Sequence, residues 1–297
     1  MKKILLILLS LSAAFLGGAE KVIPICFKQD PGIVIDGRLS RTDWADIKYE
    51  VTFAPGRGKQ GGYKIFKFKG PQDISGSVKV AYRADGLYFG FNVIDDVHRQ
   101  KCTGRTAFKG DHVELFLDLE PLFAGKATVF GKKQFQILFS PGAFDGKIKP
   151  EVFMYHPVKQ NLTTPVAAVK TSAGYSLEAF LPWSVFGLKA APSTSTGKLI
   201  AMDFLISDTD GEEPVQEKFL YAGKSPYTMA RGRMLNFYLS DSRGTLPADL
   251  NVSGKINFCK DLLLDGKTPE KIYSFDFTPA AGATPVLNFY GWNVTDG

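Results

Sequence analysis

The sequence predicts an all-β protein, a two-sheet antiparallel β-sandwich of jelly-roll type with short helical turns. The 297 residues include 24 Phe, 30 Gly and 17 Pro, and 13% of them are aromatic. Short segments with alternating apolar and polar residues recur along the chain. Each segment ends at Gly, Pro, Asp or Ser. Regular short strands separated by such turn residues are typical of an antiparallel sandwich.

The predicted strands share this alternation or a short apolar run. In chain order they are 77–84, 87–95, 112–120, 133–140, 151–158, 167–182, 198–208 and 234–241. The pair Asp85-Gly86 between the first two is the clearest hairpin signal. Helical turns are expected at 41–47 and at 181–188. In the second, Pro182 suits the first helical position and Gly187 suits the end.

The N-terminus has the layout of a secretory signal peptide at residues 1–19. Two lysines precede an apolar run, and small residues follow it as far as Ala19. We expect cleavage near Ala19 and a secreted or periplasmic product. No later segment offers the roughly 18 uninterrupted apolar residues of a membrane helix, so no membrane span is expected.

The mature chain is expected to comprise a main domain and an extension. We assign residues 20–243 to the β-sandwich. Composition changes after Arg243, and a new alternating run begins at 272–279. Residues 244–297 are therefore predicted to be a C-terminal β extension or part of a second module.

Charge and cysteine content exclude several classes of protein. The formal net charge is +6, and the lysines are scattered except in 63–70, so the basic stripe of a nucleic-acid-binding protein is missing. Cys26, Cys102 and Cys259 lack CxxC spacing. They permit at most one disulfide within a monomer, and three pairings are open.

The segment GDHVELFLDLE, residues 110–120, carries four acids and a histidine on a predicted strand. Side chains alternate across a strand, so one face holds Val113, Leu115, Leu117 and Leu119. The opposite face is polar apart from one aromatic ring: His112, Glu114, Phe116, Asp118 and Glu120. The polar face suits a solvated surface, a metal site, a catalytic carboxylate pair or a ligand-binding face.

Six segments in order resemble the family 9 carbohydrate-binding modules, which bind cellulose- and xylan-type sugars. These segments are 35–47, 77–96, 110–118, 133–139, 174–188 and 200–211. The resemblance implies a β-sandwich that holds a sugar between two aromatic rings, with polar side chains on the sugar hydroxyls. It also implies frequent structural calcium and frequent partnership with glycoside hydrolases.

Carried over by position, the resemblance gives candidate ligand-binding residues. Phe108, three residues before Asp111, matches one clamp ring, and Tyr221 is the nearest candidate for the other. Trp is usual at both positions. Glu114 matches the polar partner on the strand, and Gln134 or Gln136 matches the one on the next strand. An aromatic ring packs against the apolar face of a sugar, and Glu and Gln side chains can pair with its hydroxyls.

Two acidic segments are candidate calcium ligands, because Ca²⁺ prefers several carboxylate oxygens. The first contains Asp95 and Asp96 at a strand end. The second is the stretch ISDTDGEE, which contains Asp208 and Asp210. Simple acidic turns are the alternative.

We expect an exported, non-catalytic carbohydrate-binding protein that binds a polysaccharide or oligosaccharide and supports glycan degradation. A structural or protein-binding sandwich, or an accessory part of a glycoside hydrolase, is the main alternative. Catalysis needs two carboxylates about 5–9 Å apart, whereas Glu114 and Asp118 lie roughly 13 Å apart on one strand. A cross-strand pair of Glu114 and Glu178 stays open. A haem-binding sandwich would need Met and His axial ligands; Met154 and His156 lie two residues apart on one strand and cannot bind opposite faces of a haem, and a pairing with Met202, Met229 or Met234 stays open.

Overall fold

The structure is a computed structural model that describes residues 22–39, 41–53, 60–61, 69–119, 130–192, 199–223 and 234–247. The chain divides after Leu246, and all described residues except Pro247 belong to the first of its two units. The predicted signal peptide at 1–19, the predicted strand at 272–279 and Cys259 lie outside the described residues, as does most of the predicted extension at 244–297.

Strands dominate the described part, and helical structure is confined to short turns. The helical turns are α1 (Arg41–Trp44), η1 (Gly104–Lys109) and η2 (Trp183–Phe186). The strands are β1 (Val22–Phe27), β2 (Glu50–Phe53), β3 (Gln60–Gly61), β4 (Ile74–Tyr82), β5 (Gly86–Asp95), β6 (His112–Asp118), β7 (Gln134–Ser140), β8 (Glu151–His156), β9 (Gln160–Leu162), β10 (Val166–Thr171), β11 (Gly174–Pro182), β12 (Leu199–Asp208), β13 (Lys218–Tyr221) and β14 (Leu235–Leu239).

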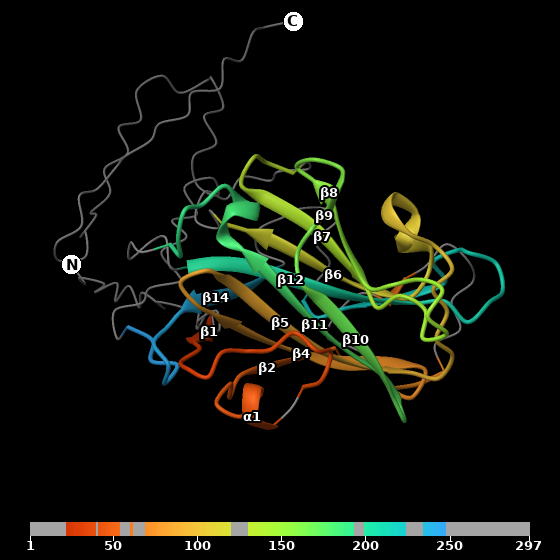
Figure 1. Cartoon of the computed structure of the whole chain (residues 1–297), viewed down its shortest axis with the longest axis horizontal. Helices are drawn as coiled ribbons and strands as arrows, with labels where there is room; N and C mark the ends of the chain where they lie inside the picture. The colour runs from red at the N-terminus through yellow and green to blue at the C-terminus, as the bar shows by residue number, and fades with distance from the viewer. Residues whose placement is uncertain are drawn as a thin grey trace, which may run out of the picture. The chain divides into compact units, whose positions relative to one another are not determined.

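The strands form two layers of one curled sheet, as Figure 1 shows. One layer, here the β5 layer, has the order β10-β11-β5-β4-β1, with β2 beside β4. The other, the β6 layer, has the order β1-β14-β12-β6-β7-β8-β9, with β13 beside β12. The predicted β-sandwich is confirmed.

β1 connects the two layers, because it pairs in parallel with a different strand along each half. Val22–Ile25 pairs with β14, and Cys26–Phe27 pairs with β4. The remaining pairs are antiparallel, as predicted. The sequence analysis predicted no strand at 22–27. The partners of this segment, β4 and β14, lie far from it in the sequence, so their pairing leaves no local signal.

The predicted strand 167–182 is instead a hairpin of β10 and β11. Gly174, which opens β11, has φ of +146°. A Cβ atom there would lie 2.3 Å from the carbonyl oxygen of Val93. Glycine is therefore required at the point where the chain turns back against β5.

The predicted hairpin at Asp85-Gly86 is confirmed, but the glycine serves a different purpose from the usual one. Asp-Gly pairs commonly supply positive φ angles to a tight turn. Here Gly86 is the first residue of β5 and pairs with Pro182 of β11. A Cβ on Gly86 would lie 2.3 Å from the carbonyl oxygen of Leu181, so close strand approach explains the glycine.

A single apolar core fills the space between the layers. From the β6 layer it takes Val113, Leu115 and Leu117, and from the β5 layer it takes rings such as Phe89 and Phe91. Trp183 belongs to this core, and Trp44 belongs to a second cluster outside the β5 layer. Both indoles are buried, so each contributes a large apolar area to its cluster.

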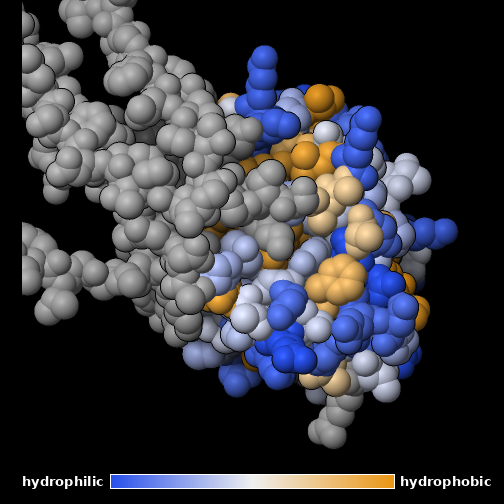
Figure 2. Space-filling view, turned by 90° about the vertical axis from the view of Figure 1, so that its left-hand side faces the viewer, coloured by the Kyte–Doolittle hydropathy of each residue, from blue (hydrophilic) through white to orange (hydrophobic). Residues whose placement is uncertain are grey.

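The described surface is mainly polar. Figure 2 shows hydrophilic side chains with smaller apolar spots between them on the face that it presents. Among the described residues, no helix is both long and apolar enough to cross a membrane. Cys26 and Cys102, the two cysteines in the described ranges, form no disulfide with each other.

Candidate functional site

β6 has the two faces that its sequence predicts. Val113, Leu115 and Leu117 point into the core, so the alternate side chains of His112, Glu114, Phe116 and Asp118 point away from it. However, this outer face is not an open surface. All seven residues of β6 are buried, and Glu114 is only 2% exposed.

Glu114 is held by two neighbouring polar side chains. Its Oε2 accepts a hydrogen bond of 3.0 Å from Nε2 of Gln136 on β7. Its Oε1 lies 3.3 Å from Nε2 of His112, and Nδ1 of that ring is 2.7 Å from the carbonyl oxygen of Gly110. The structure therefore brings together two predicted ligand-binding residues, Glu114 and Gln136, and keeps the carboxylate oriented.

Gln134 is engaged elsewhere. It is buried, and its Nε2 donates a hydrogen bond of 2.9 Å to Oδ2 of Asp118. Its Oε1 accepts a hydrogen bond of 2.7 Å from the backbone N–H of Gly131. Of the two predicted glutamines, Gln136 is the one that contacts Glu114.

Phe108 lies on η1 and is half-buried. Its ring is 6.5 Å from the ring of Tyr155, at an interplanar angle of 78°. Tyr155 lies on β8, where the pairing with β7 shifts between Gln136 and Ile137. Burial and the negative charge of Glu114 raise the pKa of the Tyr155 hydroxyl. Phe108 and Tyr155 therefore lie beside the Glu114–Gln136 pair.

Tyr155 is a residue that the sequence analysis missed. Its signal was ambiguous, because the strand that follows Gln136 contains two aromatic residues, Phe153 and Tyr155. The irregular pairing that turns it toward Phe108 cannot be inferred from alternation. Its hydroxyl donates a hydrogen bond of 2.9 Å to the carbonyl oxygen of Arg105, which fixes the ring against η1.

Tyr221 shares a cross-strand row with Glu114, because both pair with Leu205. Strands are spaced about 4.8 Å apart, so the two Cα atoms are roughly 10 Å apart. Yet the tyrosine is only 1% exposed, and its ring packs against Phe116 and Phe219. It lies on the predicted face, but its ring is enclosed by neighbouring side chains.

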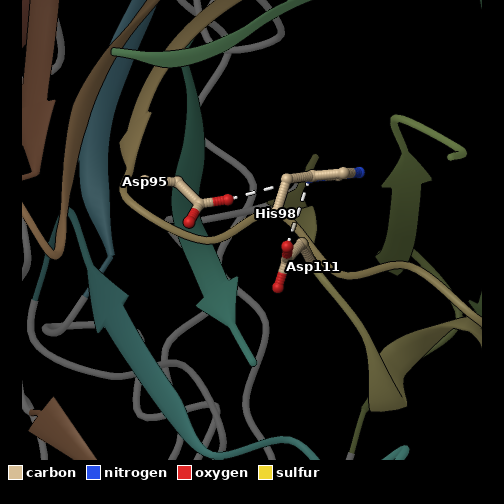
Figure 3. Close-up of side chains that lie close together, drawn as sticks. All are labelled: Asp95, His98 and Asp111. Atoms are coloured by element: carbon tan, nitrogen blue, oxygen red, sulfur yellow. Dashed lines mark ion pairs between the residues drawn. The ribbon is translucent and has the colours of Figure 1, made fainter. Parts of the chain in front are cut away.

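Three of the four predicted metal ligands belong to two neighbouring groups of three side chains, and Asp208 belongs to neither. One group is Asp95, His98 and Asp111, which Figure 3 shows at the end of β5 and before β6. The other group is Asp73, Asp96 and Asp210. Within each group, one possible ligand atom per residue lies within 4.8 Å of the others. The sequence analysis did not single out His98, Asp111 or Asp73.

A buried lysine occupies part of this acidic region. Nζ of Lys218 lies 2.6 Å from Asp73, 2.7 Å from Asp208 and 2.8 Å from Asp210. Burial lowers the pKa of Lys218, but the hydrogen bonds to these three carboxylates outweigh it, so the net pKa is raised. Asp208 and Asp210 thus have a protein cation between them, and the four predicted residues do not form a single calcium-ligand set.

Burial favours the neutral forms of Asp208 and Asp111 at this end of the sandwich. Burial, followed by the negative charge of Asp111, raises the pKa of Asp208 to about 9. Burial also raises the pKa of Asp111 to about 7, against the opposing effect of His98. These directions indicate an excess of negative charge at this end of the sandwich.

The alternative catalytic pair of Glu114 and Glu178 is not formed. Glu178 lies on β11 of the β5 layer, where Oε1 accepts a hydrogen bond of 2.7 Å from Nε1 of Trp44. Its Oε2 accepts hydrogen bonds of 2.8 Å from the N–H groups of Asp36 and Gly37. The two carboxylates therefore belong to different layers.

The family model described as "Carbohydrate family 9 binding domain-like" matches residues 37–225, more than half of the chain. The chain belongs to this family. Membership of family 9 confirms the predicted resemblance, and it assigns the chain to binding modules and not to enzymes, as the sequence analysis expected. No curated protein matches the sequence of this family 9 domain.

Solved structures similar to this family 9 domain include two of a carbohydrate-binding module from Caldicellulosiruptor kristjanssonii. The complex with glucose is 15% identical, covers 74% of this chain and 96% of its own, and has a TM-score of 0.50. The complex with cellotriose is 16% identical, covers 76% of this chain and 98% of its own, and has a TM-score of 0.49. The likeness to the glucose complex supports the fold.

Proposed function

We propose that this family 9 domain binds a sugar or the end of a polysaccharide at Phe108, Tyr155, Glu114 and Gln136. The observation that carries the proposal is the Glu114–Gln136 pair beside two half-buried rings. A polar pair next to aromatic surface is the combination that sugar recognition requires, because a sugar has both an apolar face and paired hydroxyls.

The pair provides complementary hydrogen-bonding groups. A carboxylate only accepts hydrogen bonds, whereas the glutamine amide both donates and accepts. The hydrogen bond between Glu114 and Gln136 orients both side chains before a ligand arrives. A ligand then loses less free energy to the ordering of these side chains.

The stacking role falls to Phe108 and Tyr155 in this proposal. Tyr221 stays a predicted ligand-binding residue, but its buried ring would have to turn outward before it could stack on a sugar. The enclosure of Tyr221 and Glu114 favours a second candidate function, a sandwich that binds another protein and no sugar. Glycan binding decides between the two.

The test is calorimetry of the full chain with glucose, cello-oligosaccharides and xylo-oligosaccharides. We expect binding that weakens about tenfold or more in Phe108→Ala and in Tyr155→Ala, since a lost stacking contact of about 1.4 kcal/mol lowers affinity tenfold. Tyr49→Ala is the matched control, because Tyr49 is exposed and lies outside the candidate site. Thermal melting of each variant checks that it folds.

Equal affinity of all three variants would assign the sugar to another face. Absence of binding by the wild-type chain to any of these glycans would support the protein-binding alternative.

We also propose that the protein is exported and acts beside glycoside hydrolases. The signal-peptide pattern of residues 1–19 supports export. A non-catalytic domain that holds a polysaccharide would keep a hydrolase close to its substrate, which raises the local concentration of both.

Structural calcium stays a prediction, and two of its predicted ligands, Asp96 and Asp210, lie in one group with Asp73. All three offer carboxylate oxygens, which suit Ca²⁺. Nζ of Lys69 and Nζ of Lys218 form ion pairs with Oδ2 of Asp210 at 3.1 Å and 2.8 Å. Calcium would have to displace both lysines from this oxygen.

A further inference from the structure

Three segments from both layers converge at Asp95, His98 and Asp111. Asp95 is the last residue of β5, His98 lies in the segment that follows, and Asp111 directly precedes β6. Figure 3 shows the His98 side chain forming an ion pair with each of the two carboxylates. Both carboxylate side chains are buried, and the His98 side chain is only 11% exposed.

The orientation of His98 leaves Nδ1 facing the acids. Nε2 is 2.8 Å from the carbonyl oxygen of Gly142, and a carbonyl only accepts hydrogen bonds, so Nε2 carries a hydrogen. Nδ1 lies 3.2 Å from Oδ2 of Asp111 and 3.7 Å from Oδ2 of Asp95. A histidine that donates one ring N–H to a backbone carbonyl and presents the other nitrogen is the usual arrangement of a metal ligand.

Each carboxylate is held by backbone N–H groups. Oδ1 of Asp111 accepts a hydrogen bond of 2.7 Å from Thr209, and Oδ2 accepts one from Arg99. Oδ1 of Asp95 accepts a hydrogen bond of 2.9 Å from Val97. The backbone thus fixes both carboxylates in place, as a preformed ion site requires.

Several buried polar atoms in this group have no hydrogen-bond partner in the described part of the chain. They include Oδ2 of Asp95, Nδ1 of His98 and the hydroxyl of Tyr175. Tyr175 is fully buried, and its ring is 5.5 Å from the imidazole. Leaving buried polar atoms without a hydrogen bond costs about 1–3 kcal/mol each, and an ion between the carboxylates and the imidazole would satisfy Oδ2 of Asp95 and Nδ1 of His98.

We propose that Oδ2 of Asp95, Nδ1 of His98 and Oδ2 of Asp111 bind a divalent transition-metal ion of the zinc class. Zinc accepts histidine nitrogen and carboxylate oxygen at about 2.0–2.1 Å, and a tetrahedral site of that size separates its ligand atoms by about 3.3–3.4 Å. The two separations from Nδ1, 3.2 Å and 3.7 Å, bracket this value.

The donor set disfavours calcium at this position. Ca²⁺ takes six to eight oxygen ligands, whereas the imidazole supplies a nitrogen, which suits transition metals. The site is distinct from the candidate sugar site, and the proposal does not depend on sugar binding. The bound ion would connect the end of β5 to the start of β6 across the sandwich.

The test uses the full chain stripped of metal with EDTA and titrated calorimetrically with ZnCl₂ and, separately, with CaCl₂. We expect one Zn²⁺ per chain, bound at least 100-fold more tightly than Ca²⁺ at this site. His98→Gln should weaken zinc binding at least tenfold. His156→Gln is the matched control, because this second half-buried histidine lies outside the group.

A measurement on the wild-type chain covers the case in which His98→Gln does not fold. The chain has three histidines, so ¹H–¹⁵N spectra can follow each imidazole during the zinc titration. We expect the Nδ1 chemical shift of one imidazole to change in proportion to the zinc bound. An unchanged ring protonated on both nitrogens, with no zinc bound, would overturn the proposal in favour of a simple ion pair between His98 and its acids. Equal zinc binding by His98→Gln would also overturn it.

Discussion

Glu178 illustrates at the residue scale how a buried acid can be structural. Its three hydrogen bonds join β11 to the backbone of Asp36 and Gly37 and to the indole of Trp44. Ser176 of β11 also donates a hydrogen bond of 2.6 Å to the carbonyl oxygen of Gly37, so the two side chains together anchor this segment to the β5 layer. In the sequence, nothing distinguishes Glu178 from Glu114, because both are acids at alternating positions of a strand.

We expect Glu178→Gln to lower the free energy of unfolding by about 1–3 kcal/mol. One acceptor oxygen would be replaced by an NH₂ group that faces N–H donors, which leaves buried polar groups unpaired. Urea denaturation measures the change. Glu50→Gln, at an exposed position on β2, should change stability by less than about 0.5 kcal/mol. Equal effects of the two substitutions would contradict the anchoring role.

At the scale of elements, a buried tyrosine of β5 is hydrogen-bonded to the turn that joins β4 and β5. The hydroxyl of Tyr88 on β5 donates a hydrogen bond of 3.0 Å to Oδ2 of Asp85 in the turn. Burial, followed by this bond, raises the pKa of Tyr88 to about 12. The folded protein therefore retains the phenolic hydrogen to a higher pH than the unfolded chain, in which the pKa is about 10.

The pH dependence follows from this difference. Because the folded state binds the proton more tightly, the contribution of Tyr88 to stability is complete below pH 10 and is lost as the pH rises toward 12. We expect Tyr88→Phe to lose less stability than the wild type between pH 9 and pH 11, measured by urea denaturation. Tyr49→Phe, at an exposed position, should behave as the wild type. A Tyr88→Phe variant with unchanged pH dependence would refute this assignment.

At the scale of the described unit, β1 makes the two layers one structure. It pairs with β14 in the β6 layer and with β4 in the β5 layer, and Ile25 packs in the shared core. The side-chain hydroxyl of Ser240 also donates a hydrogen bond of 2.9 Å to the carbonyl oxygen of Ile25. Loss of this strand would open both layers at the same edge.

We expect Ile25→Ala to lower the free energy of unfolding by about 2–5 kcal/mol through the cavity that it leaves. The half-buried Ile23 supplies the matched control Ile23→Ala, which should cost less. Both layers should still unfold in one transition, with tryptophan fluorescence and circular dichroism giving coincident curves. Two separate transitions would show that β1 does not couple the layers.

The sequence by itself determined the fold class, most strands and the two faces of β6. Alternation of apolar and polar residues is a local signal, so it can be read without knowledge of partners. The resemblance to family 9 implied Phe108, Glu114 and Gln136 as site residues, and the two adjacent acids Asp95 and Asp96 indicated an acidic region.

Tertiary structure alone decided which of these side chains meet and which are enclosed. The pairing shift at β8 brought Tyr155 to Phe108, neighbouring rings enclosed Tyr221, and the meeting of β5 with β6 brought Asp95 and Asp111 to Nδ1 of His98. These outcomes depend on strand register and on packing between residues far apart in the sequence. Alternation carries no information on either, because it fixes the face of a side chain but not its neighbour across the sheet.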